Sequence, residues 1–278
     1  MSEFSDNPEF CKLVAGQREV DLVHLMLELA GDAYPNLDPV ECLMEVDRLG
    51  VSCGDLRAKR NTQCPGERLA EISRVLYDVE GFHGNREAYY EPQNSYLNEV
   101  LKRRCGIPIS LGILYMAVAA RSGLKTFGVN TPGHFVVGCS YADRVWYVDP
   151  FSGGDVLDRR ACACRIEQMV GRQGVVCDEH FHPAEPLEIA ARVLRNLKAA
   201  YAMRDRWQDV LTVQRRLVTL LPCVADERRD LGLVHLRLGQ PAKALALLEP
   251  YLATCPSEQA EALRPSVVAA RRMAAERN

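Results

Sequence analysis

The stretch from Asn94 to Gly154 most constrains what this 278-residue chain can fold into. It begins with a helical segment, passes Gly106 and Pro108, and continues as a helix that is apolar nearly all round. A helix of that composition is buried. Three short strands follow it, the first ending near Val129 and the third at Asp149. The order predicts an α+β domain in which a small antiparallel sheet packs against a buried helix.

The second and third strands predict a hairpin that brings two polar side chains together. Segments 134–139 and 144–149 flank a turn at Ser140–Asp143. In an antiparallel hairpin centred on that turn, opposed positions have numbers that sum to about 283, so His134 faces Asp149 on one side of the sheet. A carboxylate opposite an imidazole fixes its tautomer and orientation, as in nucleophile–His–Asp sites. The plainer alternative is that His134 only starts a strand and Asp149 only caps a turn before Pro150.

Helices precede this core, and a loop joins them to it. Helical patterns run over about 19–31, 38–49 and 65–77, and these helices are expected to cover the core. The loop over 81–93 is punctuated by glycine, asparagine and proline. It also contains Tyr89 and Tyr90, which either form one rim of a cleft or pack down on the domain.

The composition argues against several classes of protein. Hydrophobic residues make up 47% of the chain and charged residues 26%, as in soluble globular proteins. A net charge of −3 gives no reason to expect nucleic acid or an anionic membrane as a partner. No apolar run is long enough to span a bilayer, and the polar, acidic N-terminus is not a secretory signal. We therefore expect a cytoplasmic protein.

Cysteine is frequent, with 11 residues scattered along the chain and no C-x-x-C. Without a secretion signal they are expected to be reduced thiols. One cluster combines the side chains that zinc prefers: Cys162, Cys164, Cys177, His180 and His182. Because C-A-C and H-F-H are poor spacings for a structural zinc site, we expect no metal there and no other cofactor.

The C-terminal part of the chain repeats itself with a shift of 34 residues. Leu194, Leu197, Tyr201 and Pro222 recur as Arg228, Leu231, His235 and Pro256. This period is typical of tetratricopeptide repeats, which are pairs of helices, and a closing helix is expected over 261–276. We expect a first domain over 1–180, with a helical part over 1–93 and a core over 94–160. Helical repeats then fill 181–278, and their concave face suits a protein or peptide partner.

Three motifs of the core resemble one family. NSYLNEVLKRRCGIPISL, PGHFVV and YVDPFSGG resemble the SirB-type transglutaminase-like family of bacterial proteins. In that family a domain of the papain-like superfamily is followed by tetratricopeptide-like helices, and eukaryotic F-box relatives carry the same domain. The resemblance covers about 20–256. It implies that His134 and Asp149 match the histidine and aspartate of a Cys–His–Asp triad. It also implies a cleft lined by Asn94, Asn98, Pro108, Tyr89 and Tyr90.

The nucleophile of that triad does not match. Active relatives place a cysteine at the start of the core helix in a Gly-x-Cys motif, and the matching residues here are Gly106, Ile107 and Pro108. Proline fits a first helical turn but cannot attack a carbonyl. Two substitutes lie nearby: Cys105 comes before the helix, and Ser110 points about 200° round it from Pro108. Either would have to reach the imidazole to act. The alternative is that Cys105 is an ordinary small side chain and that Ser110 caps the helix or packs.

Three functions remain open. We favour a non-catalytic protein-interaction or regulatory protein in which Pro108 occupies the nucleophile position. The alternative is a cysteine-dependent hydrolase or acyltransferase that acts on peptide or amide bonds through His134 and Asp149. The third is a metal site in the Cys/His connector over 162–182.

Overall fold

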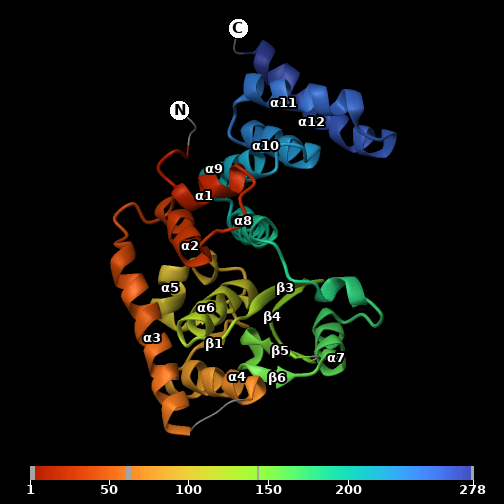
Figure 1. Cartoon of the computed structure of the whole chain (residues 1–278). Coiled ribbons are helices and arrows are strands. Elements are labelled where there is room, and N and C mark those ends of the chain that lie inside the picture. Colours follow the sequence, from red (N-terminus) through yellow and green to blue (C-terminus); the bar gives the residue numbers. More distant parts are fainter. Residues whose placement is uncertain (1–3, 61–63, 143, 277–278) are drawn as a thin grey trace. The chain divides into compact units, whose positions relative to one another are not determined.

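The computed structural model describes residues 4–60, 64–142 and 144–276, with the side chains of 55–60 outside the description (Figure 1). The chain divides into two compact units, Met1–Val193 and Leu194–Asn278. The boundary falls within helix α8 (Pro186–Ala202), beyond the expected position at residue 180. The difference arises because the intervening segment packs on the sheet of the first unit: the N–H of Ala184 donates to the carbonyl of Gly128 at 2.8 Å.

The first unit is built on a four-stranded antiparallel sheet in the order β3-β4-β5-β6. Its strands are β3 (Phe127–Thr131), β4 (His134–Tyr141), β5 (Arg144–Asp149) and β6 (Asp155–Leu157). Figure 1 shows helix α6 (Pro108–Arg121) on one side of this sheet and α7 (Arg159–Val170) on the other. Val136 and Tyr147 pack in one buried cluster with Ile166 of α7. Phe135 lies against Gly112 of α6, where a Cβ would have no room. The α+β class and the buried core helix are confirmed.

The hairpin of β4 and β5 has a different register from the expected one. Val137 pairs with Val148, and Tyr141 pairs with Arg144, so the pairing is shifted by two residues. Strand β4 continues to Tyr141, beyond its expected end at residue 139, whereas β5 begins at Arg144 as expected. Asp143, expected in the turn, lies outside the described residues. Because side chains alternate with period two, a shift of two residues keeps His134 and Asp149 on one face.

Four α-helices of the described ranges pack against α6 besides the sheet: α2 (Leu22–Gly31), α3 (Pro39–Arg60), α4 (Pro65–Ser73) and α5 (Leu97–Arg103). Helix α1 (Pro8–Val14) packs against α2. The helix expected over 65–77 is α4 followed by a π-helical segment, Arg74–Val79. A two-residue parallel pairing of β1 (His83–Gly84) with β2 (Cys105–Gly106) holds the 81–93 loop beside the start of α6.

The second unit is all helical. After the end of α8 it contains α9 (Trp207–Leu220), α10 (Ala225–Arg237), α11 (Pro241–Thr254) and α12 (Ser257–Ala275). Gly232 of α10 allows close packing, because a Cβ there would lie 2.7 Å from the side chain of Leu248. Tyr251 and Leu263 belong to one buried cluster that joins α11 to α12. None of the helices in the described ranges combines the length and apolarity needed to cross a bilayer.

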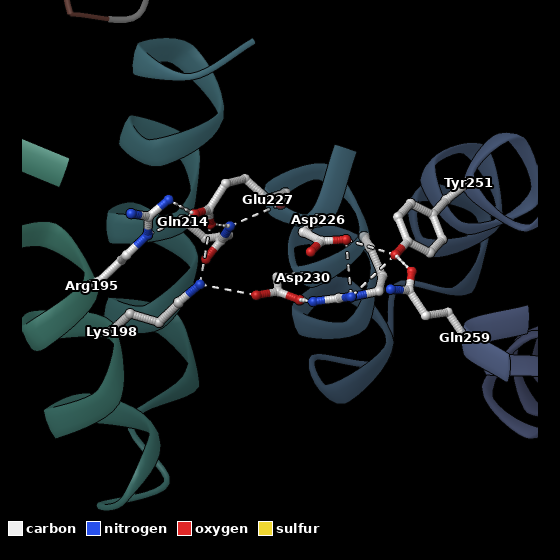
Figure 2. A network of polar contacts seen from close by, with 9 residues as sticks. Arg195, Lys198, Gln214, Asp226, Glu227, Asp230, Tyr251 and Gln259 are labelled. Carbon is white, nitrogen blue, oxygen red and sulfur yellow. Dashed lines mark hydrogen bonds and ion pairs between the residues drawn. The ribbon is translucent and has the colours of Figure 1, made fainter. Parts of the chain in front are cut away.

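A buried polar network links α8, α9 and α10 within this second unit (Figure 2). Its centre is the carboxylate of Glu227, whose side chain is 5% exposed. The donors to it are Arg195 at 2.8 Å, Lys198 at 3.2 Å and Gln214 at 2.9 Å. Burial raises the pKa of Glu227, but the hydrogen bonds from Gln214 and Arg195 and the charge of Lys198 outweigh it, so the pKa lies below its usual range.

Candidate functional site

His134 and Asp149 lie at the same end of the sheet, since β4 begins at the histidine and β5 ends at the aspartate. The side chains are each 1% exposed, and Nε2 of His134 is 2.8 Å from Oδ1 of Asp149. An ionised carboxylate only accepts hydrogen bonds, so Nε2 carries a hydrogen, and in the neutral imidazole Nδ1 keeps a lone pair. The imidazole is therefore held in one tautomer and one orientation.

Asp149 has a second task as the cap of the short 3₁₀ helix Pro150–Ser152. Its Oδ1 accepts from the backbone N–H of Phe151 at 3.1 Å and of Ser152 at 3.3 Å. Burial raises the pKa of Asp149, but the hydrogen bond from His134, together with these donors, lowers it more. The carboxylate is ionised at neutral pH, and both tasks proposed for it from the sequence are present in the geometry.

The other nitrogen of His134 is unpaired. Nδ1 is fully buried and has no hydrogen-bond partner in the described part of the chain. The ring of Phe151 lies edge-on to the imidazole with centroids 6.2 Å apart, and Tyr89 stands edge-on to Phe151 at 5.9 Å. Aromatic rings from the 81–93 loop and from the 150–152 turn therefore line the surroundings of an imidazole that has a free lone pair.

Neither candidate nucleophile is hydrogen bonded to that imidazole. Ser110 is completely buried, and its Oγ donates to the carbonyl of Asn94 at 2.6 Å and accepts from the N–H of Ile107 at 3.1 Å. These bonds fix the first turn of α6, so the hydroxyl has a structural task. Cys105 is buried in β2, where it pairs with His83, and Pro108 is the first residue of α6.

Asn94 holds the 81–93 loop in place. Its Nδ2 donates to the carbonyls of Ala88 at 2.7 Å and Tyr89 at 3.1 Å, and its Oδ1 accepts from Asn85 at 3.0 Å. Tyr89 is half-buried, whereas Tyr90 is 50% exposed. Tyr89 therefore packs down on the domain and Tyr90 faces outward, and the cleft rim stays a prediction.

Asn98 of α5 is half-buried, and its Oδ1 is fully enclosed without a hydrogen-bond partner among the described residues. An unpaired buried carbonyl oxygen is uncommon in a folded protein. Among the described atoms of the expected site, Nδ1 of His134 and Oδ2 of Asp149 are also buried without a hydrogen-bond partner.

A cation that the sequence did not single out lies beside the same sheet end. Arg192 of α8 donates through Nη1 to the carbonyl of Thr131 at 3.0 Å and to Oδ1 of Asn130 at 3.3 Å. Thr131 pairs with His134 across β3 and β4. No motif marks this arginine, because α8 had been assigned to the repeats.

The cysteine- and histidine-rich connector is spread over different environments. Cys162 packs in the core between α7 and the sheet, and burial raises the pKa of its thiol to about 12. Cys177 is exposed, and its Sγ lies 3.1 Å from Nδ1 of His180. In the ranges that the structure describes, no three His, Cys, Asp or Glu side chains gather as a metal site would require.

The fold and this site define a class: an α+β domain with a buried core helix and a His–Asp pair at the end of its sheet, followed by helical repeats. Residues 41–195 match the family model described as the transglutaminase-like superfamily, and residues 197–275 match a tetratricopeptide repeat model. The chain belongs to the transglutaminase-like superfamily.

Named relatives narrow the class further. A UPF0162 protein of Xylella fastidiosa (strain Temecula1) is 36% identical over 247 residues, which cover 85% of this chain and 84% of that protein. Protein SirB1 of Salmonella typhimurium is 25% identical over 193 residues, covering 69% and 71%. F-box only protein 21 of Mus musculus is 40% identical over 110 residues, covering 37% and 18%. These relatives confirm the SirB-type resemblance. No solved structure is similar enough to count as a match.

Proposed function

We propose that this protein is a non-catalytic interaction or regulatory protein, in which the transglutaminase-like domain binds without cleaving and the repeat unit holds a protein partner. One observation carries the first half of the proposal. Nδ1 of His134 is the atom whose lone pair would activate a nucleophile. It is buried and has no hydrogen-bond partner in the described part of the chain.

The reaction of a transglutaminase-like enzyme requires a nucleophile within about 2.6–3.2 Å of its base, or somewhat more without ligand. Pro108 stands where the resemblance places that nucleophile. The hydroxyl of Ser110 is engaged with Asn94 and Ile107, and the thiol of Cys105 is not hydrogen bonded to His134. These contacts favour binding over bond cleavage.

The repeat unit supports the second half of the proposal. It contains a hollow of about 780 Å³ between α8, α9, α10 and α12. The lining is mostly apolar and includes Trp207, Val210 and Leu233, with Lys198 and Arg237 among the polar members. Tetratricopeptide repeats present such surfaces to peptides, so we assign a peptide segment of a partner protein to this hollow.

A cysteine-dependent hydrolase or acyltransferase is the second candidate. The buried hydrogen bond between His134 and Asp149 favours it, because that arrangement orients a general base. The candidate requires the thiol of Cys105 to approach Nδ1 when a substrate binds.

Site-resolved alkylation separates the two functions. Iodoacetamide is applied at neutral pH, modification is followed by mass spectrometry, and exposed Cys64 and Cys223 serve as internal references. We expect Cys105 to react no faster than these references and His134→Ala to leave its rate unchanged. A thiol introduced by Pro108→Cys should instead react faster than the references, and should lose this advantage when His134→Ala is added.

Fast alkylation of Cys105 in the parent protein, slowed strongly by His134→Ala, would contradict the non-catalytic function. Loss of a thiol-dependent amidase or acyl-transfer activity in Cys105→Ser would do the same. The partner is tested separately. A protein identified by capture should bind the purified full chain directly, and Trp207→Ala should weaken that binding while Trp146→Phe leaves it unchanged.

A further inference from the structure

Arg192 is a cation with no counter-ion among the residues that the structure describes. It lies in α8 within the first unit, and its side chain is half-buried. Burial lowers the pKa of its guanidinium, which shows that the charge is partly removed from water. Yet its contacts in the described part of the chain are to neutral oxygens, the carbonyl of Thr131 and the amide of Asn130.

The neighbouring acid on the same helix does not neutralise it. Glu188 is one turn earlier and at a spacing that allows an ion pair, but its Oε2 accepts from the backbone N–H of Glu185 at 2.9 Å. No described carboxylate lies within ion-pair distance of Arg192. Removing a charge partly from water costs free energy unless the charge is paired. The surroundings of Arg192 therefore favour the binding of an anion that is not one of the described residues.

The free donors of Arg192 are available to such an anion. Both contacts use Nη1, whereas Nε and Nη2 make no hydrogen bond in the described ranges and are not among the fully enclosed atoms. Nε and Nη2 form one edge of the planar guanidinium, and that edge matches the two oxygens of a carboxylate.

The same cation belongs to the surroundings of the His–Asp pair. Its anchor, Thr131, is paired with His134, and the hydroxyl of Thr131 donates to the carbonyl of His134 at 2.8 Å. Burial raises the pKa of Tyr89, and the charge of Arg192 opposes that rise. Tyr89 in turn contacts Phe151, which contacts His134.

We propose that Arg192 binds a carboxylate of a peptide ligand at the end of the sheet where Thr131 of β3 pairs with His134 of β4. The inference rests on the proposed function in one respect, namely that the domain binds a ligand without cleaving it. A single guanidinium edge suits one singly charged carboxylate, whereas phosphate sites commonly combine several cations or backbone donors. The carboxylate belongs either to the C-terminus of a peptide or to an acidic side chain.

Three synthetic peptides test the proposal on the full-length protein. The first is acetyl-Ala-Ala-Ala with a free C-terminal carboxylate, the second is its C-terminal amide, and the third is acetyl-Ala-Glu-Ala-amide. Inorganic phosphate is a fourth probe. Binding is measured by titrating the Nε–Hε NMR signal of Arg192, assigned by its loss in Arg192→Gln. Mass spectrometry of each peptide after incubation detects cleavage.

We expect one of the two carboxylate peptides to bind at least about tenfold more tightly than the neutral peptide, because a charge-assisted bidentate pair is lost with the charge. Which of the two binds identifies the source of the carboxylate. Arg192→Gln should abolish the difference between acid and amide, and Arg192→Lys should restore part of it. Exposed Arg160, for which no ion pair is present among the described contacts, supplies the control Arg160→Gln, which should bind as the parent does.

Equal binding of charged and neutral peptides, binding of phosphate alone, or no binding of any probe at millimolar concentration would overturn the carboxylate site. The acid–amide comparison in the parent protein does not depend on whether Arg192→Gln folds. Cleavage of a peptide would instead contradict the proposed function. Mass spectrometry would detect the cleavage products whichever of the peptides binds.

Discussion

Replacing Glu227 by glutamine tests how strongly the polar network of Figure 2 stabilises the repeat unit. Glutamine keeps the size of the side chain and removes its charge. The change leaves the cationic donors Arg195 and Lys198 without their shared carboxylate, while Gln214 keeps its hydrogen bond to the backbone carbonyl of residue 227 at 2.8 Å. The repeat unit should therefore lose stability without losing its packing.

The size of the expected destabilisation follows from how exposed the side chains of Arg195 and Lys198 are. Breaking a fully buried ion pair costs about 3–5 kcal/mol. Here the side chain of Arg195 is 50% exposed and can regain water, and Lys198, at 22%, keeps its ion pair with Asp230 at 2.9 Å. We therefore expect Glu227→Gln to lower the free energy of unfolding by about 2 kcal/mol at pH 7.

The loss should depend on pH in a defined direction. The folded-state pKa of Glu227 is lowered relative to an unfolded value of about 4.3. A lowered pKa contributes stability that is fully present above the unfolded pKa and is lost as the pH falls through the folded pKa. The difference between parent and variant should thus be constant near neutrality and shrink below about pH 4.

The assay uses the two tryptophans of the chain, Trp146 in the first unit and Trp207 in the second. In a Trp146→Phe background, urea unfolding followed by fluorescence reports on the repeat unit alone. The control is Glu249→Gln, because Glu249 and Arg271 form an exposed pair whose loss should cost less than about 0.5 kcal/mol. A Glu227→Gln effect no larger than the control, or one of the same size at pH 7 and pH 3, would refute the reasoning.

Three further predictions concern the first unit. Asp149→Ala should lower its free energy of unfolding by about 3 kcal/mol, measured from Trp146 fluorescence in Trp207→Phe, because a buried imidazole and two backbone N–H groups lose their acceptor. Ser110→Ala should cost about 1–2 kcal/mol in the same assay and leave ligand binding unchanged, since its hydroxyl only holds the start of α6; unchanged stability with altered binding would contradict that role. Purified protein should contain little zinc by elemental analysis, because no metal is expected at the Cys/His connector. Stoichiometric zinc that is lost in a Cys162→Ser, Cys164→Ser variant would contradict this prediction.

Much of the fold follows from local sequence. A helix that is apolar nearly all round had to be buried, and the short strands that follow it had to form a sheet against it. The 34-residue period marked the helical repeats. The register of the hairpin did not follow, because Ala142 adopts a φ of +49°, which alanine rarely does, and residue preferences therefore place the turn differently.

The candidate site was predictable where it depends on chain order and parity. His134 and Asp149 share a face under either register, so the error of two residues did not separate them. The capping role of Ser110 was one of the alternatives that the sequence left open, whereas the role of Arg192 was not predictable, because it depends on a partner far along the chain. Ser110 donates a hydrogen bond to the carbonyl of Asn94. Arg192 donates to residues 130 and 131 at the end of β3, which lie some 60 residues earlier in the sequence.

Asp149 both orients His134 and caps the following turn, and these two roles affect how such chains are classified. Even without any reaction, the aspartate is needed to seat the turn at Phe151 and Ser152, and the histidine is needed to satisfy the buried carboxylate. Drift that removes a nucleophile therefore does not release these two positions from selection for folding. A motif search that accepts a His–Asp pair as the mark of an enzyme would classify this chain as one whether or not it turns over a substrate. The residue that distinguishes the two cases is the first residue of α6.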